Sequence, residues 1–441
     1  MNAISAGDTA WVLTSSALVM VMTVGLAFFY GGLVRPKNAL NTMMMSVVAL
    51  GVVSVQWVLV GYSIAFGHGT PWWGGLAWLG FKGVGLEPDA AYGATIPLQA
   101  HAMFQLMFAI ITPALISGAI VERMRFRAYV VFLVLWATFV YDPLAHWVWG
   151  SGGWLAKLGA LDFAGGTVVH ISAGVSALVA AAMLGPRKDF KRTAIVPHNV
   201  PLVLLGAGLL WFGWFGFNAG SALAANGLAA LAFTNTNTAA ATALVAWVCL
   251  DLLRTGKATA VGAATGLVVG LVGITPAAGY ITAPASLAVG ALAALVSYTA
   301  IQIRAKTRLD DSLDVFSCHG LAGVAGALLT GVFATKLANP AGGDGWLAGN
   351  FAQMGVQLAA ILAAVAIAAA GTAVILGIVQ ATLGAKAGVR EQLSGLDLSE
   401  HGEEAYFGEQ GATPSPGVSL GQGVIVSAAS PEPTEAAAVA G

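Results

Sequence analysis

The chain has 441 residues, of which 58% are hydrophobic and only 9% are charged. Water-soluble domains carry about a quarter charged residues, so this composition excludes a solvated globule. The formal net charge of −1 argues against nucleic acid or another polyanion as a partner. The composition therefore indicates a protein that crosses a membrane several times.

Apolar runs of about 20 residues, the length that spans a bilayer, recur along the chain. They lie near 11–33, 43–66, 98–121, 128–149, 166–185, 200–220, 229–250, 259–276, 284–303, 316–334 and 350–381. We therefore predict an all-α polytopic membrane protein with eleven transmembrane helices. No Lys or Arg precedes Arg35, so the first run lacks the basic start of a cleaved signal peptide and is expected to remain a helix.

Lys and Arg are divided unevenly between the predicted connections. Sixteen of the 19 fall on one side of the membrane, and only Lys82, Lys157 and Lys336 fall on the other. Because positive residues collect on the cytoplasmic side, we predict that the N-terminus is outside and the C-terminus is cytoplasmic. A miscounted helix would destroy this asymmetry, so the asymmetry also supports the odd number of helices.

The chain carries weak internal repeats. The stretch FYGGLVRPKNAL (29–40) resembles FNAGSALAANGL (217–228), and Asp162 and Asp311 each precede a histidine, His170 and His319, by eight residues. We therefore predict that helices 1–5 and 6–10 are related halves, with the eleventh helix added. Because five is odd, the halves have opposite topology, a plan that places a substrate path at their interface near the membrane midplane.

His170 and His319 are predicted to meet near the middle of the membrane. Each lies about 12 Å along its helix from the preceding aspartate, and the two helices enter from opposite faces. Ionisable residues inside a membrane are costly and usually line a pathway. A packing role is the alternative for each histidine. A metal site is disfavoured because only two nitrogen ligands are at hand, and we predict no cofactor.

Asp162 and Asp311 begin the two histidine-bearing helices. A carboxylate at such a position caps the free N–H groups of the first helical turn, and favouring a cation at a pore entrance is a compatible second role. Asp310 and Asp314 are expected to be solvated or capping residues on the cytoplasmic face. No enzyme is predicted, because the inventory of acids, bases and metal ligands is too thin, and no GxxxxGK[ST] loop for ATP occurs.

From about Trp11 to Phe407 the sequence resembles the ammonium transporter (Amt/Mep/Rh) family, bacterial Amt type. The resemblance rests on six fragments in order: AFFYGGLVRPKN (27–38), GAIVERMRF (118–126), DFAGGTVVH (162–170), GWFGFNAGSA (213–222), GLVGITPAAGY (270–280) and DVFSCHG (314–320). The resemblance implies a homotrimer in which each chain has its own pore, located in the plasma (bacterial inner) membrane.

The same resemblance implies roles for particular residues. Ammonium would be recruited by a substrate site of Trp149, Phe108 and Ser221, above a gate of Phe108 and Phe217, and methylammonium is left open as a second substrate. His170, His319 and Trp214 would line the pore and relay a proton, with Asp162 and Asp311 in structural or deprotonation support and Gln105 beside the path. Without the resemblance, core packing is the better interpretation of the two phenylalanines, and a place in the interfacial aromatic belt is open for Trp149.

The mechanism implied is deprotonation of ammonium, passage of neutral ammonia between apolar walls, and a separate relay of the proton through the histidines. Conduction of neutral gas alone is the rival mechanism. An ammonium sensor on the same scaffold is the rival function, although no signalling domain follows the membrane region.

Three parts of the chain are distinguished by composition. Residues 1–384 form the membrane domain, and residues 385–410 resemble the family's cytoplasmic regulatory region. The acidic cluster of Glu400, Glu403 and Glu404 lies in the second part and is also consistent with a solvated surface. A PII-type signalling protein is the partner implied at this face. Residues 411–441 are rich in Ala, Pro, Ser and Gly and are predicted to be disordered.

Overall fold

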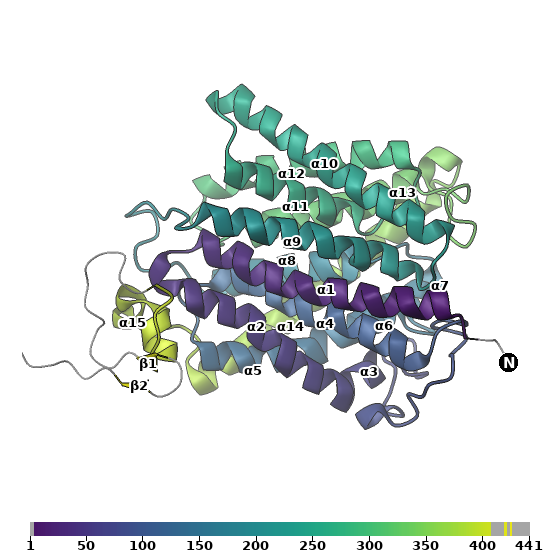
Figure 1. The fold of residues 1–441 in the computed structure, drawn as a ribbon, viewed down its shortest axis with the longest axis horizontal. Coiled ribbons are helices and arrows are strands. Elements are labelled where there is room, and N and C mark those ends of the chain that lie inside the picture. Colours follow the sequence, from purple (N-terminus) through teal and green to yellow (C-terminus); the bar gives the residue numbers. More distant parts are fainter. Residues whose placement is uncertain (1–3, 407–418, 421–423, 426–441) are drawn as a thin grey trace, which may run out of the picture.

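The computed structural model describes residues 4–406, 419–420 and 424–425. Long helices run side by side through one bundle, with the first helix beginning at one end and α15 at the other (Figure 1). We call these ends the N-terminal face and the C-terminal face. The first half contains α1 (Ala6–Leu33), α2 (Ala39–Gln56), α3 (Tyr62–Phe66), α4 (Leu98–Ile120), α5 (Phe126–Trp136), α6 (Asp142–Trp149), α7 (Trp154–Leu158) and α8 (Ser172–Leu184).

The second half repeats this plan and is followed by the C-terminal helices. It contains α9 (Val200–Ala219), α10 (Gly227–Thr255), α11 (Ala260–Ile274), α12 (Ala283–Lys306) and α13 (Ala322–Phe333), and the chain continues into α14 (Ala352–Leu383) and α15 (Val389–Ser394). Four π-helical segments extend or join these helices, namely η2 (Trp57–Gly61), η4 (Ala137–Tyr141), η5 (Gly166–Ile171) and η7 (Phe316–Leu321), and a fifth, η9 (Asp397–His401), follows α15. Short 3-10 turns occur at Pro36–Asn38, Leu79–Phe81, Gly220–Ala222 and Trp346–Ala348.

Eleven apolar helical stretches agree with the predicted membrane crossings. Within the described residues, ten are long and apolar enough to cross a membrane, and the shorter apolar α11 is the eleventh. The crossing predicted at 259–276 ends at Ile274 because Pro276 has no backbone N–H to continue the helix. The all-α prediction with eleven helices is confirmed for this part of the chain.

The first helices of the two halves, α1 and α9, pack closely along each other. The contact depends on small residues: a Cβ on Gly206 would lie 2.3 Å from the backbone nitrogen of Phe29, and one on Gly25 would lie 2.9 Å from Cβ of Leu209. Such close helix approach is typical of membrane helices, where packing rather than water exclusion holds the bundle together.

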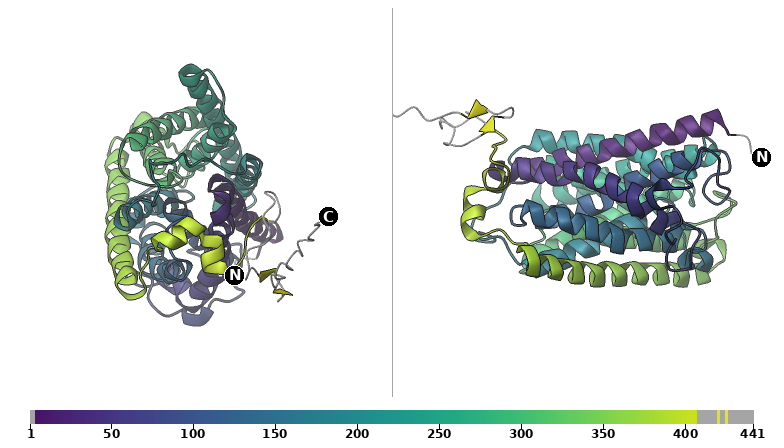
Figure 2. Two further views of the ribbon diagram at one scale, coloured as in Figure 1. Left: turned by 90° about the vertical axis from the view of Figure 1, so that its left-hand side faces the viewer. Right: turned by 90° about the horizontal axis from the view of Figure 1, so that it is seen from below.

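The helix α14 runs along the outside of the bundle, and the C-terminal region (residues 385–406) turns back over the C-terminal face (Figure 2). Beyond it, β1 (Ser419–Leu420) pairs with β2 (Val424–Ile425) in an antiparallel ladder of two residues each. The remainder of the tail predicted to be disordered, residues 411–441, lies outside the described residues.

Candidate functional site

His170 and His319 meet in the middle of the bundle. Their Nδ1 atoms lie 3.2 Å apart, and their rings are stacked with centroids 5.3 Å apart. Both side chains are almost completely buried. In a hydrogen bond between two Nδ1 atoms, one must carry a proton and the other must not. The pair therefore holds a single proton between the facing nitrogens, and protonating both would set two donors against each other.

Trp214 covers the other side of His170. The two rings are stacked at 5.3 Å with an interplanar angle of 20°. Among the described residues, His170 Nε2 is buried without a hydrogen-bond partner. A buried polar atom left in this way is an unusual cost in a folded protein. It makes Nε2 the one polar atom of this ring free to bond a small molecule.

Each histidine is carried by a helix whose start is capped by an aspartate. The carboxylate of Asp162, itself 5% exposed, accepts the backbone N–H groups of Gly165 and Gly166 through Oδ1 and those of Thr167 and Val168 through Oδ2, at 2.6–3.1 Å. Four satisfied donors are all that the open first turn of a helix offers. The local structure from Asp162 onward is therefore fixed by one side chain.

Asp311 has the equivalent position in the second half. Its Oδ1 accepts the N–H of Val315 at 3.0 Å, and its Oδ2 accepts that of Phe316 at 2.8 Å. The carboxylate thus caps the segment that carries His319, as the shared spacing of eight residues predicts. The two caps lie at opposite ends of the histidine pair because the helices run in opposite directions.

Two glycines allow the histidine-bearing helices to touch. A Cβ on Gly174 would lie 2.2 Å from the backbone nitrogen of Gly320 and 2.3 Å from its Cα. A Cβ on Gly323 would lie 3.2 Å from Cβ of His170. The backbones of the two helices are therefore in direct contact beside the histidines, and this contact sets the distance between the imidazoles.

Phe108 and Phe217, the two residues expected to form a gate, lie on the N-terminal side of His170. Their ring centroids are 4.2 Å apart, and both side chains are buried. The ring of Trp149 lies edge-on to Phe108 at 6.0 Å. The hydroxyl of Ser221 donates to the backbone oxygen of Phe217 at 2.9 Å, which leaves its lone pairs available as acceptors. The four residues proposed from the sequence as substrate site and gate thus come from three helical segments, α4, α6 and α9 with its following turn.

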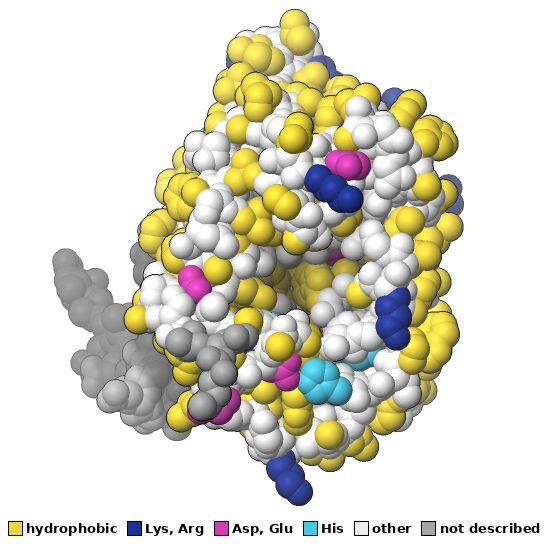
Figure 3. Space-filling model, turned by 90° about the vertical axis from the view of Figure 1, so that its right-hand side faces the viewer, with side chains coloured by type: hydrophobic (Ala, Val, Ile, Leu, Met, Phe, Trp, Pro, Cys, Tyr) yellow, Lys and Arg dark blue, Asp and Glu magenta, His cyan; other side chains and the backbone are white. Residues whose placement is uncertain are grey.

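The N-terminal face has a hollow near its middle, with hydrophobic side chains visible inside it (Figure 3). Gln105 lies one turn before Phe108 on α4, beside His101, and its Oε1 is buried without a partner among the described residues. The position is compatible with the predicted place of Gln105 beside the path.

The space next to the histidines is narrow and apolar. A cavity of about 10 Å³, room for roughly one water-sized molecule, is lined by His170, His319, Trp214 and Phe217 and otherwise by aliphatic and aromatic side chains. His319 also lines a larger cavity of about 440 Å³ toward the C-terminal face, whose wall includes Arg304. His319 thus lines both cavities, the narrow one beside Trp214 and the larger one toward the C-terminal face.

Thr275 belongs to this site and is not identified by the sequence reasoning. Its hydroxyl accepts the indole N–H of Trp214 at 2.9 Å and donates to the backbone oxygen of Leu271 at 2.7 Å. Thr275 directly follows the last residue of α11, Ile274, and immediately precedes Pro276. The fragment GLVGITPAAGY contains Thr275, but the fragment alone does not reveal the contact with Trp214. This contact forms only in the folded structure, at the end of α11.

A buried charge network at the C-terminal face is also missed by the sequence reasoning. Glu122, whose side chain is fully buried, pairs with Arg35 at 2.9 Å and with Arg187 at 2.7 Å. Burial alone would raise the pKa of the Glu122 carboxyl, but the bonds and charges of the two guanidinium groups outweigh it and lower this pKa to about 2. The network joins three connections between helices, and its fragment in the sequence, VERMRF, gives no indication of its partners.

The expectation that Asp310 is a solvated or capping residue is wrong. Asp310 is 1% exposed and forms a bidentate contact with Arg187, at 2.8 and 3.0 Å. Two arginine N–H groups and the backbone N–H of Arg187 compensate the burial of this charge. Asp314 differs, since it keeps about a fifth of its side chain exposed and pairs with Arg304.

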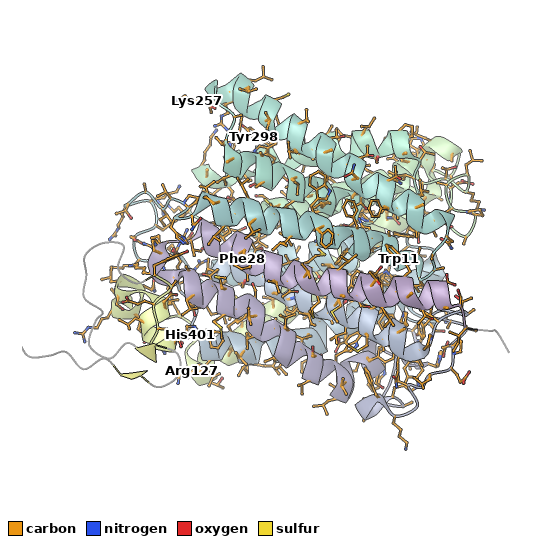
Figure 4. All side chains as sticks on the ribbon, in the orientation of Figure 1. Trp11, Phe28, Arg127, Lys257, Tyr298 and His401 are labelled. Carbon is orange, nitrogen blue, oxygen red and sulfur yellow. The ribbon has the colours of Figure 1, made fainter. Side chains whose placement is uncertain are left out.

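The C-terminal region caps two membrane helices that have no cap of their own. Asp397 accepts the N–H of Asn41 at 2.7 Å at the start of α2, and Glu400 accepts that of Phe126 at 3.0 Å at the start of α5. Figure 4 places His401 beside these helix starts. Of the three glutamates expected in an acidic cluster, Glu400 therefore has a defined contact with the membrane domain.

Known proteins are similar to this chain over most of its length. A model of the Ammonium Transporter Family matches residues 10–406. An ammonium transporter of Bacillus subtilis is 49% identical over 401 residues, which cover 91% of this chain and 98% of the relative. An ammonium transporter of Aquifex aeolicus is 51% identical over 409 residues, covering 91% and 93%.

Two solved structures have the same fold. The crystal structure of Saccharomyces cerevisiae Mep2 superposes with a TM-score of 0.83 at 37% identity and covers 88% of each chain. A sensor Amt protein superposes with a TM-score of 0.82 at 28% identity and covers 90% of this chain and 98% of that one. The full-length relatives are transporters, in agreement with the prediction that the protein is not an enzyme. The chain belongs to the ammonium transporter family.

Proposed function

We propose that the protein takes up ammonium across the plasma membrane through a pore within each chain. The observation that carries this proposal is the arrangement of His170 and His319. Their Nδ1 atoms lie 3.2 Å apart, share one proton, and lie beside a cavity of about 10 Å³. A cavity of this size accepts one small molecule, and its largely apolar lining includes the two imidazoles. Ammonia, which both donates and accepts hydrogen bonds, fits such a site.

Recruitment takes place at Trp149, Phe108 and Ser221. A small cation gains about 0.5–2 kcal/mol over an aromatic face, and the free lone pairs of the serine hydroxyl accept one of its N–H groups. The stacked pair of Phe108 and Phe217 then bars the path to the charged species, because an ion loses several kcal/mol of solvation in a dry pore. Ammonium therefore gives up a proton at the gate, and ammonia continues.

The proton follows a separate path through the histidine pair. A proton accepted at Nε2 of one ring is passed on when the proton between the facing Nδ1 atoms shifts to the other ring, which then releases the proton of its own Nε2. Asp162 and Asp311 support this pathway by fixing the helices from which the histidines extend. K⁺, which has no proton to lose, is excluded by the apolar walls.

The C-terminal face is assigned to the cytoplasm, in accordance with the excess of Lys and Arg there. The C-terminal region then forms the regulatory part of the molecule, and a PII-type protein is its partner at this face. The active unit is a homotrimer in the lipid bilayer, with one pore in each protomer.

A sensor is the second candidate function, favoured by the match to a sensor Amt protein over 98% of its length. The two functions differ in whether ammonium passes or only binds. Neutral ammonia conduction differs from both in moving no charge.

Purified protein in proteoliposomes on a solid-supported membrane distinguishes these cases. A sustained current after an ammonium pulse, absent after a K⁺ pulse and lost in Asp162→Ala, supports electrogenic transport. Ammonia flux without current supports a neutral conduit. Ammonium binding without flux supports the sensor function.

A further inference from the structure

A buried amide on the outermost helix holds the segment that contains Asp162. Residues 159–165 join α7 to η5 in an irregular conformation, and Asp162 lies in the middle of this segment. Gln357 on α14, which is 1% exposed, bonds both backbone groups of Leu161. The N–H of Leu161 donates to Oε1 at 2.8 Å, and Nε2 donates to the oxygen of Leu161 at 2.8 Å. One side chain thus pairs with this residue as a neighbouring strand would.

The same amide reaches the helix that carries His319. Nε2 of Gln357 also donates to the backbone oxygen of Ala327 at 3.1 Å, and Ala327 follows His319 by eight residues, about two helical turns. Oε1 accepts a second bond from Gln353 Nε2 at 3.2 Å, and Gln353 in turn donates to the oxygen of Gly159 at 3.0 Å. All four bonds of the Gln357 amide are made.

The other anchors of the segment belong to the pore itself. The indole N–H of Trp149 donates to the oxygen of Asp162 at 2.9 Å, and the N–H of Phe163 donates to the oxygen of Pro276 at 3.1 Å. Gln357 differs from these residues because it lies on α14, outside the pore. It links the start of one histidine-bearing helix to the side of the other.

We propose that Gln357 is a positioning residue for transport. It fixes the position of Asp162, along the axis of the helix that carries His170, relative to the histidine pair. This inference rests on the proposed function. Because Asp162 caps η5 with four hydrogen bonds, a shift of Leu161 moves the start of the His170 helix with it. Without the amide, the two buried backbone groups of Leu161 lose this partner, and the segment must move to regain one, whereas the oxygen of Ala327 still lies within α13.

The test compares Gln357→Met with Thr372→Val. Methionine keeps the length of the side chain and removes all four bonds. Thr372 is the matched control because it lies on the same helix, is fully buried, and bonds Ser176 and Trp136 at 2.8 and 3.0 Å without touching residues 159–163. Both variants lose buried polar bonds, so a general loss of stability affects both.

Two measurements are made on each variant in proteoliposomes or detergent. The first is the ammonium current on a solid-supported membrane, corrected for the amount of folded protein. The second is hydrogen–deuterium exchange of the backbone amides at 165–168, which Asp162 caps. Displacements of about 1 Å at a site reduce rates by up to about a hundredfold. We therefore expect Gln357→Met to lower the current at least about tenfold and to speed exchange at 165–168, with neither change in Thr372→Val.

Equal currents and equal exchange in the two variants would overturn the proposal. The outcome for transport is separate: if the wild-type protein carries no ammonium, the proposed function fails, whereas the exchange measurement still decides whether Gln357 positions Asp162. Gln357→Glu adds a second variant, since it keeps the acceptor for Leu161 and removes the donors. The exchange rate at 165–168 in this variant should lie between the rates in Gln357→Met and in the wild-type protein.

Discussion

The indole of Trp214 is bonded to the hydroxyl of Thr275 at 2.9 Å, and this bond holds the ring that stacks on His170. A residue at a helix break thereby determines the shape of the narrow cavity beside the histidines. Since the bond is buried and the indole N–H has no other partner in the described part of the chain, its loss leaves an unpaired donor in an apolar wall.

Thr275→Val should reduce ammonium transport, whereas Thr275→Ser should retain most of it. Valine has the size of threonine but cannot accept the indole N–H, which costs about 1–3 kcal/mol and frees Trp214 to turn away from His170. Ammonium current and tryptophan fluorescence of the purified variants measure the effect. Wild-type current in the valine variant would show that this bond does not position the ring.

Replacing both histidines, as His170→Asp with His319→Glu, should let K⁺ pass. Two carboxyl groups put negative charge into a cavity that otherwise offers only imidazole nitrogens, so a cation no longer needs to lose a proton there. K⁺ and ammonium pulses on proteoliposomes give the two currents. His68→Asn, on the N-terminal face and away from the cavity, is the control, and an unchanged preference for ammonium in the double variant would contradict the prediction.

Asp162→Asn should abolish current and destabilise the protein by about 2 kcal/mol. Asparagine keeps the shape of the side chain, but its NH₂ group faces two backbone N–H donors that the carboxylate now accepts. Thermal unfolding and ammonium current are measured together. Asp344→Asn is the matched control, because Asp344 accepts a single backbone N–H, that of Lys336, at an exposed site.

The stability of the C-terminal face should fall in acid because of Glu122. Its pKa, 4.5 in an unfolded chain, is lowered to about 2 in the fold. A lowered pKa stabilises the folded state fully above pH 4.5, and this contribution, about 3 kcal/mol, is lost as the pH falls through 4.5 toward 2.

Unfolding temperatures of wild type and Glu122→Gln between pH 7 and 3 test this dependence. The glutamine variant should be less stable at pH 7 and should lose less stability on acidification. Parallel curves for the two proteins would mean that other groups dominate the acid response.

The positions of the histidines could be predicted from the sequence because they follow from two regular quantities. Helical rise and a shared spacing of eight residues put His170 and His319 at similar depths from opposite faces, and their meeting needs only that the halves pack together. The caps by Asp162 and Asp311 are equally local, since the donors lie three to six residues further along the chain. Periodicity and local capping can be predicted from a sequence because they depend only on residues that are close together in it.

Other parts of the site depend on contacts between distant residues, which no local pattern contains. Arg187, which pairs with Glu122, lies 65 residues away from it in the sequence. Asp397, which accepts the N–H of Asn41, lies 356 residues after it. Asp310 and Asp314 are neighbours of similar appearance in the sequence. Only the approach of Arg187 from another connection makes the first a buried ion pair and leaves the second partly exposed.

The contact of Gly174 with Gly320 has a mechanical consequence. Where two rods touch at one point, tilting one against the other displaces their ends most and the point of contact least. Gly320 is adjacent to His319, and Gly174 is one turn from His170. Changes in bilayer thickness or in the packing of neighbouring chains that tilt these helices will therefore move the two faces of the protein while the spacing of the imidazoles stays nearly constant.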